Sequence, residues 1–331
     1  MKKLIIGLLL VVISITATLA PAFAQESTKL KKVSVRACWQ LNGEFAAILN
    51  AMKEGFYAEE GLEVDLRTGG SGIDPLLLVA ARSEDFGVVA SSGLLAAAVA
   101  NGKMPVKAIA TLMQMTPSGY MYLLKEGEEP GQRTPKDFEG ARVGAQPEGW
   151  LYVKTLAKMA GLSEDDYKLV PVSWGPEPLL TGQIDYFNGW ATNQTWILDQ
   201  EGKRWGMIFI SDYIPFYADL LFARTDFIEQ NPDLVRRFVR ATMKGLQFAI
   251  DNPEKTAANV VELGMPGLTL EQNIWRLRIQ NPMCVSEDTK EYGLGHMDLQ
   301  RWEKVMEVLH EIGELERIPS VEEVMTDIYL P

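Results

Sequence analysis

Residues 33–66 of the chain are VSVRACWQLNGEFAAILNAMKEGFYAEEGLEVDL. Val33 to Trp39 predicts a β-strand, Phe45 to Glu54 predicts a helix that ends at Gly55, and Leu62 to Leu66 predicts a second strand. A strand, a helix and a second strand in this order are typical of two parallel strands joined by a crossover helix. The folded part of the chain therefore begins with a βαβ unit.

The same alternation continues on both sides of a loop at residues 126–135 that is rich in Gly, Glu and Pro. Further strands are predicted at 85–89, 106–111, 120–124, 142–145, 168–172, 185–187, 207–210 and 219–223. Helices are predicted between them at 75–82, 93–100, 150–160, 178–182 and 193–201, and a helical tail at 232–252, 253–263, 270–280 and 299–311. Two βα series predict an α/β protein with two mostly parallel sheets flanked by helices. The length also favours two compact units, because about 300 residues exceed the size at which one hydrophobic core keeps growing.

The N-terminus predicts a secretory signal at residues 1–24. Two lysines precede the apolar stretch from Leu4 to Ile13, which is shorter than the roughly 20 residues of a membrane span, and small residues lead to a cleavage site after Ala24. Since Cys38 lies well past that site, no lipid anchor is expected, and the mature protein should be periplasmic. Cys38 and Cys284 could form a disulfide there, and the sequence leaves this open.

The mature chain is strongly acidic. Of 32 basic residues, two leave with the signal, so 30 face 44 acidic ones and the net charge changes from −12 to −14. No basic patch accompanies this balance, which argues against nucleic acids and anionic membrane surfaces as partners. We expect a soluble monomer.

Metal-binding and catalytic motifs are missing from the sequence. The two histidines, His296 and His310, both fall in the predicted helical tail, so we expect neither a metal site nor a cofactor. No GxSxG or HExxH motif occurs. Glu44, Glu148 and Asp219 could come together as an acid/base pair, but acidic residues are too abundant here for this to favour an enzyme.

The candidate ligand site follows from the parallel sheets. In open α/β sheets, ligands lie outside the carboxyl ends of the strands, where loops converge and helix N-termini point inward. Four of the eight tryptophans fall in such loops. With polar neighbours, the expected ligand-binding residues are Trp39, Gln40, Asn42, Gly70, Ser91, Ser92, Trp150, Trp174, Trp190, Asn193, Tyr213, Tyr217 and Asp219.

These residue types suit a flat, uncharged molecule. Indole rings can sandwich a planar heteroaromatic ring, and offset stacking is worth about 0.5 to 1.5 kcal/mol per pair beyond burial. Asn and Ser side chains both donate and accept hydrogen bonds, as ring amides and amino groups require. The site is therefore expected to be neutral, aromatic and polar rather than ionic.

Several of these positions also have a purely structural interpretation. A tryptophan after a strand commonly fills the core. The turn from Gly69 to Gly72 lacks the lysine and hydroxyl of a phosphate-binding loop and fits a tight turn before a helix. Ser91 and Ser92 could simply cap the helix that follows them. The sequence does not choose between these roles and ligand contacts.

Longer motifs carry a family resemblance. They are Trp39 to Ala46 (WQLNGEFA), Glu54 to Val64 (EGFYAEEGLEV) followed by Gly69-Gly70, Asp212-Tyr213 with Phe216 to Asp219 (FYAD), and Asn231 to Val235 (NPDLV) leading to Arg240-Ala241-Thr242. With these motifs, the sequence resembles the thiamine-pyrimidine-synthase-like, or SsuA-like, branch of type II periplasmic solute-binding proteins, the receptors of ABC importers. The resemblance covers nearly the whole mature chain.

The resemblance implies two lobes with a ligand cleft between them and two crossover hinge strands, near Tyr120 and Asp219. Residues 25–117 and 219–331 would form lobe I with the helical tail packed on it, and residues 118–218 would form lobe II. The implied partners are a small-molecule ligand and the transmembrane subunits of an ABC permease. Such a receptor would be no enzyme.

The implied ligand is a planar nitrogen heterocycle, either riboflavin-like or a thiamine pyrimidine precursor. Thiamine-precursor binders commonly carry a histidine where this chain has Phe45, and the arrangement W-x-x-N-x-x-F with FYAD is closer to riboflavin-binding members. A receptor for nitrate or an alkyl sulfonate is an alternative, but it would need a cation in the cleft. Arg67, Lys107 and Arg142 lie on or near strands, and none is clearly at a ligand-facing end.

A secreted enzyme on the same scaffold is a further alternative. Eukaryotic relatives of this fold synthesise the pyrimidine with an active-site histidine and a cysteine-rich motif. This sequence carries no such motif and has its two histidines late in the chain, so the resemblance disfavours the enzymatic version.

Overall fold

The computed structural model describes residues 30–146 and 149–331. The expected signal segment at 1–24 and Glu148 lie outside the described residues. The strands are β1 (Lys31–Arg36), β2 (Leu62–Arg67), β3 (Phe86–Ser91), β4 (Val106–Met113), β5 (Ser118–Leu123), β6 (Arg142–Ala145), β7 (Lys168–Pro171), β8 (Tyr186–Trp190), β9 (Trp205–Phe209) and β10 (Ala218–Arg224).

Helices fill most of the remaining chain. The α-helices are α1 (Ala46–Lys53), α2 (Phe56–Glu59), α3 (Pro75–Ala80), α4 (Ser92–Ala100), α5 (Trp150–Met159), α6 (Glu177–Leu180), α7 (Gln194–Gln200), α8 (Thr225–Gln230), α9 (Pro232–Asp251), α10 (Pro253–Leu263), α11 (Leu270–Met283), α12 (Glu287–Tyr292), α13 (Leu299–Glu311) and α14 (Val321–Val324). Short 3-10 helices include η1 (Gly43–Phe45) and η5 (Ile210–Asp212). Among the described residues, no helix is both long and apolar enough to cross a bilayer.

The first sheet has the strand order β2-β1-β3-β10-β4. Strand β1 pairs in parallel with β2 and β3, whereas β10 runs antiparallel to β3 and β4. Val33 and Val35 of β1 are buried and alternate with the half-buried Ser34 and Arg36, as expected for a strand that buries one face. We call this sheet and the helices packed on it the first lobe.

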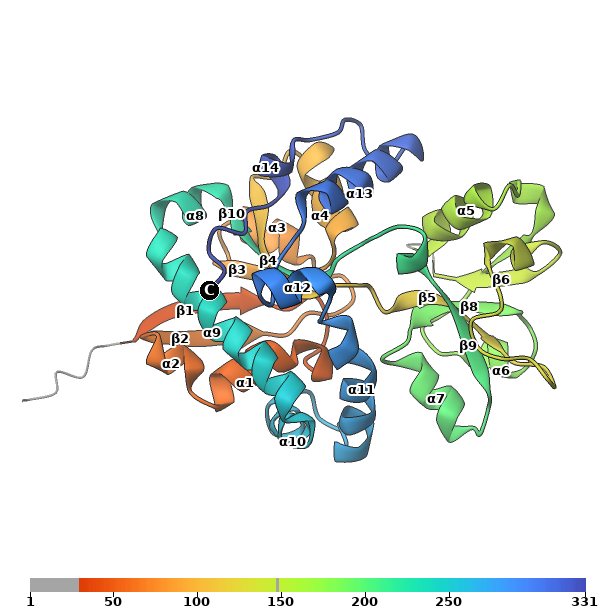
Figure 1. Ribbon diagram of the computed structural model, residues 1–331, viewed down its shortest axis with the longest axis horizontal. Helices are drawn as coiled ribbons and strands as arrows, with labels where there is room; N and C mark the ends of the chain where they lie inside the picture. The colour runs from red at the N-terminus through yellow and green to blue at the C-terminus, as the bar shows by residue number, and fades with distance from the viewer. Residues whose placement is uncertain (1–29, 147–148) are drawn as a thin grey trace, which may run out of the picture.

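The second sheet has the order β7-β6-β8-β5-β9. Strand β6 is parallel to β7 and β8, and β5 is antiparallel to β8 and β9. Each sheet is therefore mostly parallel with one reversed strand, and those two strands, β5 and β10, follow the points where the chain passes from one sheet to the other. This arrangement confirms the predicted α/β, two-lobed architecture (Figure 1).

The C-terminal helices pack mainly on the first lobe (Figure 1). Helix α9 lies against α1, α13 lies against α4, and Met325 forms a bridge with Ala108 of β4. Helix α11 differs because it also contacts α7 of the second lobe. The tail therefore reaches the boundary between the two sheets.

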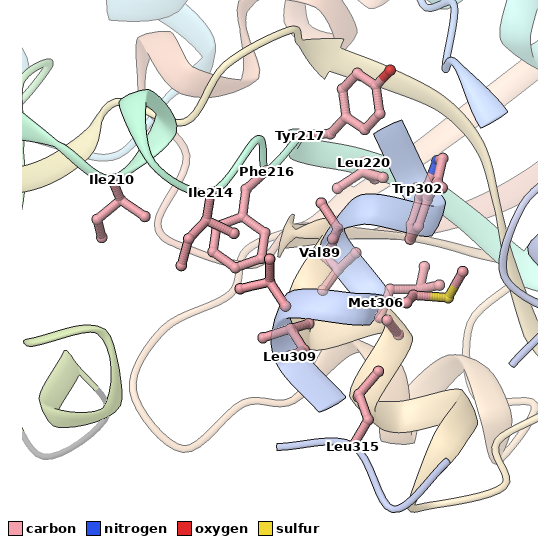
Figure 2. Close-up of a cluster of buried hydrophobic side chains, with 14 of the residues drawn as sticks. Val89, Ile210, Ile214, Phe216, Tyr217, Leu220, Trp302, Met306, Leu309 and Leu315 are labelled. Atoms are coloured by element: carbon pink, nitrogen blue, oxygen red, sulfur yellow. The ribbon is translucent and has the colours of Figure 1, made fainter. Parts of the chain in front are cut away.

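The return into the first lobe is filled with apolar side chains. Figure 2 shows Ile210, Ile214 and Phe216 on the segment that leads into β10, with Trp302 and Met306 of α13 packed nearby. All five are at most 2% exposed and belong to one contiguous cluster. Burial of this kind contributes about 25 cal/mol per Å² of apolar surface, so this end of the hinge is well ordered.

Some predicted boundaries were wrong. Strand β1 ends at Arg36 rather than Trp39, because the next residues turn toward the loop after β2, where Gly69 N–H donates to the carbonyl of Trp39 at 2.9 Å. Strand β8 continues to Trp190 rather than ending at residue 187, because Ser118 of β5 pairs with Trp190. Helices α2, α8, α12 and α14 were not predicted, since four to six residues are too few to establish a helical period.

Candidate functional site

A cavity of about 330 Å³ lies between the two sheets. Its volume is at the small end of the range typical of ligand pockets. The first lobe contributes residues that follow β1 and β3, and the second lobe contributes residues that follow β6 and β7 and the end of β8. The cavity therefore lies at the carboxyl ends of parallel strands, where open α/β sheets bind their ligands.

Six of the expected ligand-binding residues lie in the cavity wall. They are Trp39, Asn42, Ser91, Trp174, Trp190 and Asn193. Trp39 and Trp174 come from different lobes and meet with ring centroids 5.4 Å apart and planes tilted by 49°. Trp174 is 52% exposed, so an incoming ring could stack on it without displacing core packing.

A short local motif places Glu44 in the wall. The side chain of Asn42 caps η1 by accepting a hydrogen bond from Glu44 N–H at 2.8 Å. Gly43 leaves room for the side chain of Arg276, because an added Cβ would lie 2.9 Å from Arg276 Cδ. The sequence Asn-Gly-Glu at the end of the first loop therefore brings an amide, a carboxyl and a cation to one place.

Arg276 is the unexpected member of the wall. It extends from α11 and is only 4% exposed. Its guanidinium donates to Oδ1 of Asn42 and, at 3.5 Å, to Oδ1 of Asn193, so it links residues of the two lobes. Its Nε–H finds no acceptor among the described residues. The expectation that the site contains no charged groups is therefore wrong, because a buried cation lies in the wall.

Three acidic groups meet at the base of the cavity. The Cys38 thiol lies 3.6 Å from Oε1 of Glu44 and 3.8 Å from Oδ1 of Asp219, within reach of a hydrogen bond to either. Burial and the neighbouring Glu44 raise the pKa of Asp219 well above its ordinary value, and burial raises the pKa of Glu44 although Arg276 opposes the shift. The state in which both carboxyls are ionised is therefore disfavoured.

The same cluster is the group of described side chains that could hold a metal ion, since its ligand atoms lie within 4.8 Å of one another. A metal-bound cysteine must be a thiolate. Burial and the adjacent carboxylates instead raise the pKa of Cys38 well above its ordinary value. The Cys38 thiol lies within hydrogen-bond reach of both carboxyls, so we describe the cluster as hydrogen-bonded acids. Cys38 and Cys284 are both free thiols, so the disulfide left open by the sequence is not formed.

Three expected ligand residues instead hold the fold together. Trp150 lies outside the wall and donates from Nε1 to the carbonyl of Ala145 at 3.1 Å. Ser92 is fully buried, and its Oγ accepts the backbone N–H of Tyr217 at 3.1 Å. The Tyr217 hydroxyl accepts the N–H of Asp298 at 2.7 Å. Each of these side chains lies outside the cavity wall because its polar atom is hydrogen-bonded to a backbone N–H or carbonyl group.

Four further expected residues also lie outside the wall. Gln40 is exposed, and Gly70 faces open space whereas its neighbour Gly69 packs against the loop after β1. Tyr213 packs on the core cluster. Asp219 is fully buried behind Glu44 and Cys38, so it can act on a ligand only through them.

Several residues in the wall were not predicted. Tyr152, Leu94, Ile197 and Phe216 supply apolar surface, and Arg276 supplies charge. Of the cations considered from the sequence, Arg142 pairs with Asp185 and Arg67 pairs with Asp65 and Glu84, away from the cavity. Arg276 had no detectable signal, because a single arginine in a tail helix of mixed polar and apolar residues cannot be told in sequence from a solvated side chain.

Comparison with known proteins places this geometry in a family. The family described as "NMT1/THI5 like" matches residues 42–256, well over half of the chain. The chain belongs to this family. The matched segment includes Asn42 and Glu44 at one end and the whole second sheet.

Proteins similar in sequence to this chain include some named as binding proteins and some named as enzymes. The riboflavin-binding protein RibY of Chloroflexus aurantiacus is 26% identical over 95% of this chain and 90% of its own. The formylaminopyrimidine-binding protein of Halalkalibacterium halodurans is 26% identical over 79% of each chain. A 4-amino-5-hydroxymethyl-2-methylpyrimidine phosphate synthase of Legionella pneumophila is 29% identical over 69% of this chain and 72% of its own.

Solved structures share the fold. The periplasmic aliphatic sulphonate-binding protein SsuA of Escherichia coli superposes with a TM-score of 0.66, at 13% identity, over 89% of this chain and 92% of its own. The desulfurization enzyme DSZB gives 0.63 at 14% identity, over 90% of this chain and 97% of its own. The chain thus has the fold of periplasmic binding proteins, and at least one enzyme has the same fold.

Proposed function

We propose that this protein is the periplasmic solute-binding component of an ABC importer and that it captures a planar nitrogen heterocycle between its lobes. The observation that carries the proposal is the shared cavity, in which Trp39 of one lobe and Trp174 of the other meet at 5.4 Å. A flat ring would stack on the exposed face of Trp174 beside Trp39, and the amides of Asn42 and Asn193 would bond its polar edge. Two named relatives bind a flavin or a pyrimidine.

The domain arrangement belongs to the same proposal. Residues 25–117 and 219–331 would form lobe I, and residues 118–218 would form lobe II. The membership of the strands in the two sheets supports these limits, because β5 opens the second sheet and β10 returns to the first. Export of the mature protein after cleavage behind Ala24 would deliver it to an ABC permease.

We further propose that the bound molecule leaves unchanged. The thiol of Cys38 lies in the cavity wall, and burial together with the neighbouring carboxylates raises its pKa, which is the opposite of nucleophile activation. His296 and His310 lie outside the cavity wall. Recovery of the ligand with its original mass after prolonged incubation is expected, whereas a stoichiometrically formed product would contradict this part.

A binding panel tests the proposed function. Isothermal titration with riboflavin, a formylaminopyrimidine, nitrate and taurine should show saturable one-to-one binding of at least one heterocycle. Trp174→Ala should weaken that binding about tenfold, since one stacking contact and its burial are lost. Trp150→Phe is the matched control because Trp150 lies outside the wall. Binding of the anions alone would refute the proposal.

A further inference from the structure

Two carboxyl groups beside the cavity are too close and too buried to ionise independently. Glu44 is 9% exposed and Asp219 is fully buried. They come from η1 and β10, and the Cys38 sulfur lies 3.6 Å from an oxygen of one and 3.8 Å from an oxygen of the other. Like charges in such a site disfavour each other strongly, and two carboxyls commonly hold one proton between them.

The remaining charge has a partner across the cavity wall. Arg276 is buried, yet its hydrogen bonds go to the amide oxygens of Asn42 and Asn193 rather than to a carboxylate. An uncompensated buried cation is costly. Burial lowers the pKa of Arg276, and the nearby charge of Glu44 opposes that shift, so the single negative charge of the carboxyl pair partly offsets the cost of burying this cation.

We propose that Glu44 and Asp219 share one proton, that their single negative charge cancels Arg276, and that this balance selects a neutral ligand over an anion. An anion would gain from Arg276 and lose a similar amount to Glu44 in the same wall. The raised pKa values of both carboxyls agree with the shared proton. The anion-receptor alternative requires a cation in the cleft. Arg276 is such a cation, but the charge of the Glu44–Asp219 pair neutralises it.

The pairing of Glu44 with Arg276 also predicts which hydrogen-bonding groups the ligand carries on the edge that faces them. This step rests on the proposed function. A ring that offers an N–H donor to the Glu44 carboxylate and a carbonyl or ring-nitrogen acceptor to Arg276 satisfies both at once. Cyclic imides and amino-substituted azines carry such an edge. Sulfonates and nitrate carry acceptors alone and would leave Glu44 facing a negative group.

A pair of variants tests the charge balance. Asp219→Asn keeps the Glu44 carboxylate, whereas the double variant Glu44→Gln with Asp219→Asn removes all negative charge from the cluster. Titration with methanesulfonate should show no gain for Asp219→Asn and at least about a tenfold gain for the double variant. Equal gains in both variants, or none in the double variant, would overturn the shared-proton assignment. Circular dichroism would verify that both proteins fold.

The ligand edge needs a separate measurement. If riboflavin binds the wild-type protein, methylation of its imide nitrogen should weaken binding by about tenfold or more, because a hydrogen bond to a charged acceptor is lost. An unchanged affinity would overturn the proposed edge while leaving heterocycle binding intact. Failure of every heterocycle to bind would instead refute the proposed function, and the methanesulfonate test would still report on the charge balance.

Discussion

Asp219 shows how one residue can serve the fold and the site together. It lies on β10 with a φ of 50°, a left-handed conformation that asparagine and aspartate tolerate better than other side chains. Its carboxyl is buried against Glu44 and Cys38. A strained backbone conformation that carries a buried carboxyl is energetically costly, and such costs are typical of functional positions.

The titration of Asp219 predicts the pH dependence of stability. The titratable groups around it are the thiols of Cys38 and Cys284, the carboxyl of Glu44 and, beyond Glu44, the guanidinium of Arg276. Because its pKa is raised above the ordinary value of 3.8, the native state holds a proton that the unfolded chain releases, so the free energy of unfolding falls as pH rises from that value through the raised pKa. Asp219→Asn should flatten this fall. Chemical denaturation at several pH values would detect it, and an unchanged slope would contradict the shift.

Side chains in strand-end loops could be proposed from the sequence as ligand contacts. Trp39, Asn42 and Trp174 line the cavity, and their contact with a ligand stays a prediction. The same reasoning failed for Tyr217 and Ser92, because a hydroxyl that bonds a backbone N–H looks the same in sequence as one that faces a ligand. The pairing of Glu44 with Asp219 was considered from the sequence but could not be favoured, since it depends on how the crossover strand returns.

At the scale of elements, α7 and α11 form a direct contact between the lobes. Trp275 of α11 packs on Trp196 of α7, with centroids 5.2 Å apart and planes at 60°, and its Nε1 donates to Asp199 at 2.9 Å. Arg276, the next residue, reaches Asn193 at the start of α7. The sequence predicts that the tail packs on the first lobe, but no local pattern indicates that α11 also contacts the second lobe.

This contact predicts that Trp275→Phe favours the open form. Loss of an indole hydrogen bond to a carboxylate costs about 1.5 to 3 kcal/mol, so the variant should release ligand faster and show a larger radius of gyration in small-angle scattering. Trp205→Phe is the matched control, because Trp205 donates to the same Asp199 at 2.8 Å from within the second lobe. Equal effects of the two substitutions would show that Asp199, rather than the contact between lobes, matters.

At the scale of the whole molecule, the architecture could be predicted well and the site only in part. Alternating βα patterns and the motif at residues 54–64 were sufficient for two mostly parallel sheets, since periodicity is a local property. The polar side of the cavity is assembled from η1, the N-terminus of α7 and α11, which lie far apart in the chain. Only the folded topology brings such residues together, and a single sequence does not encode their contact in any short pattern.

Native mass spectrometry of the purified protein would show whether a neutral flat molecule binds between the lobes. After addition of riboflavin or a formylaminopyrimidine, we expect a one-to-one complex that survives in the wild-type protein and is depleted in Trp174→Ala. A spectrum that shows no heterocycle complex, with adducts formed only by nitrate or a sulfonate, would contradict it.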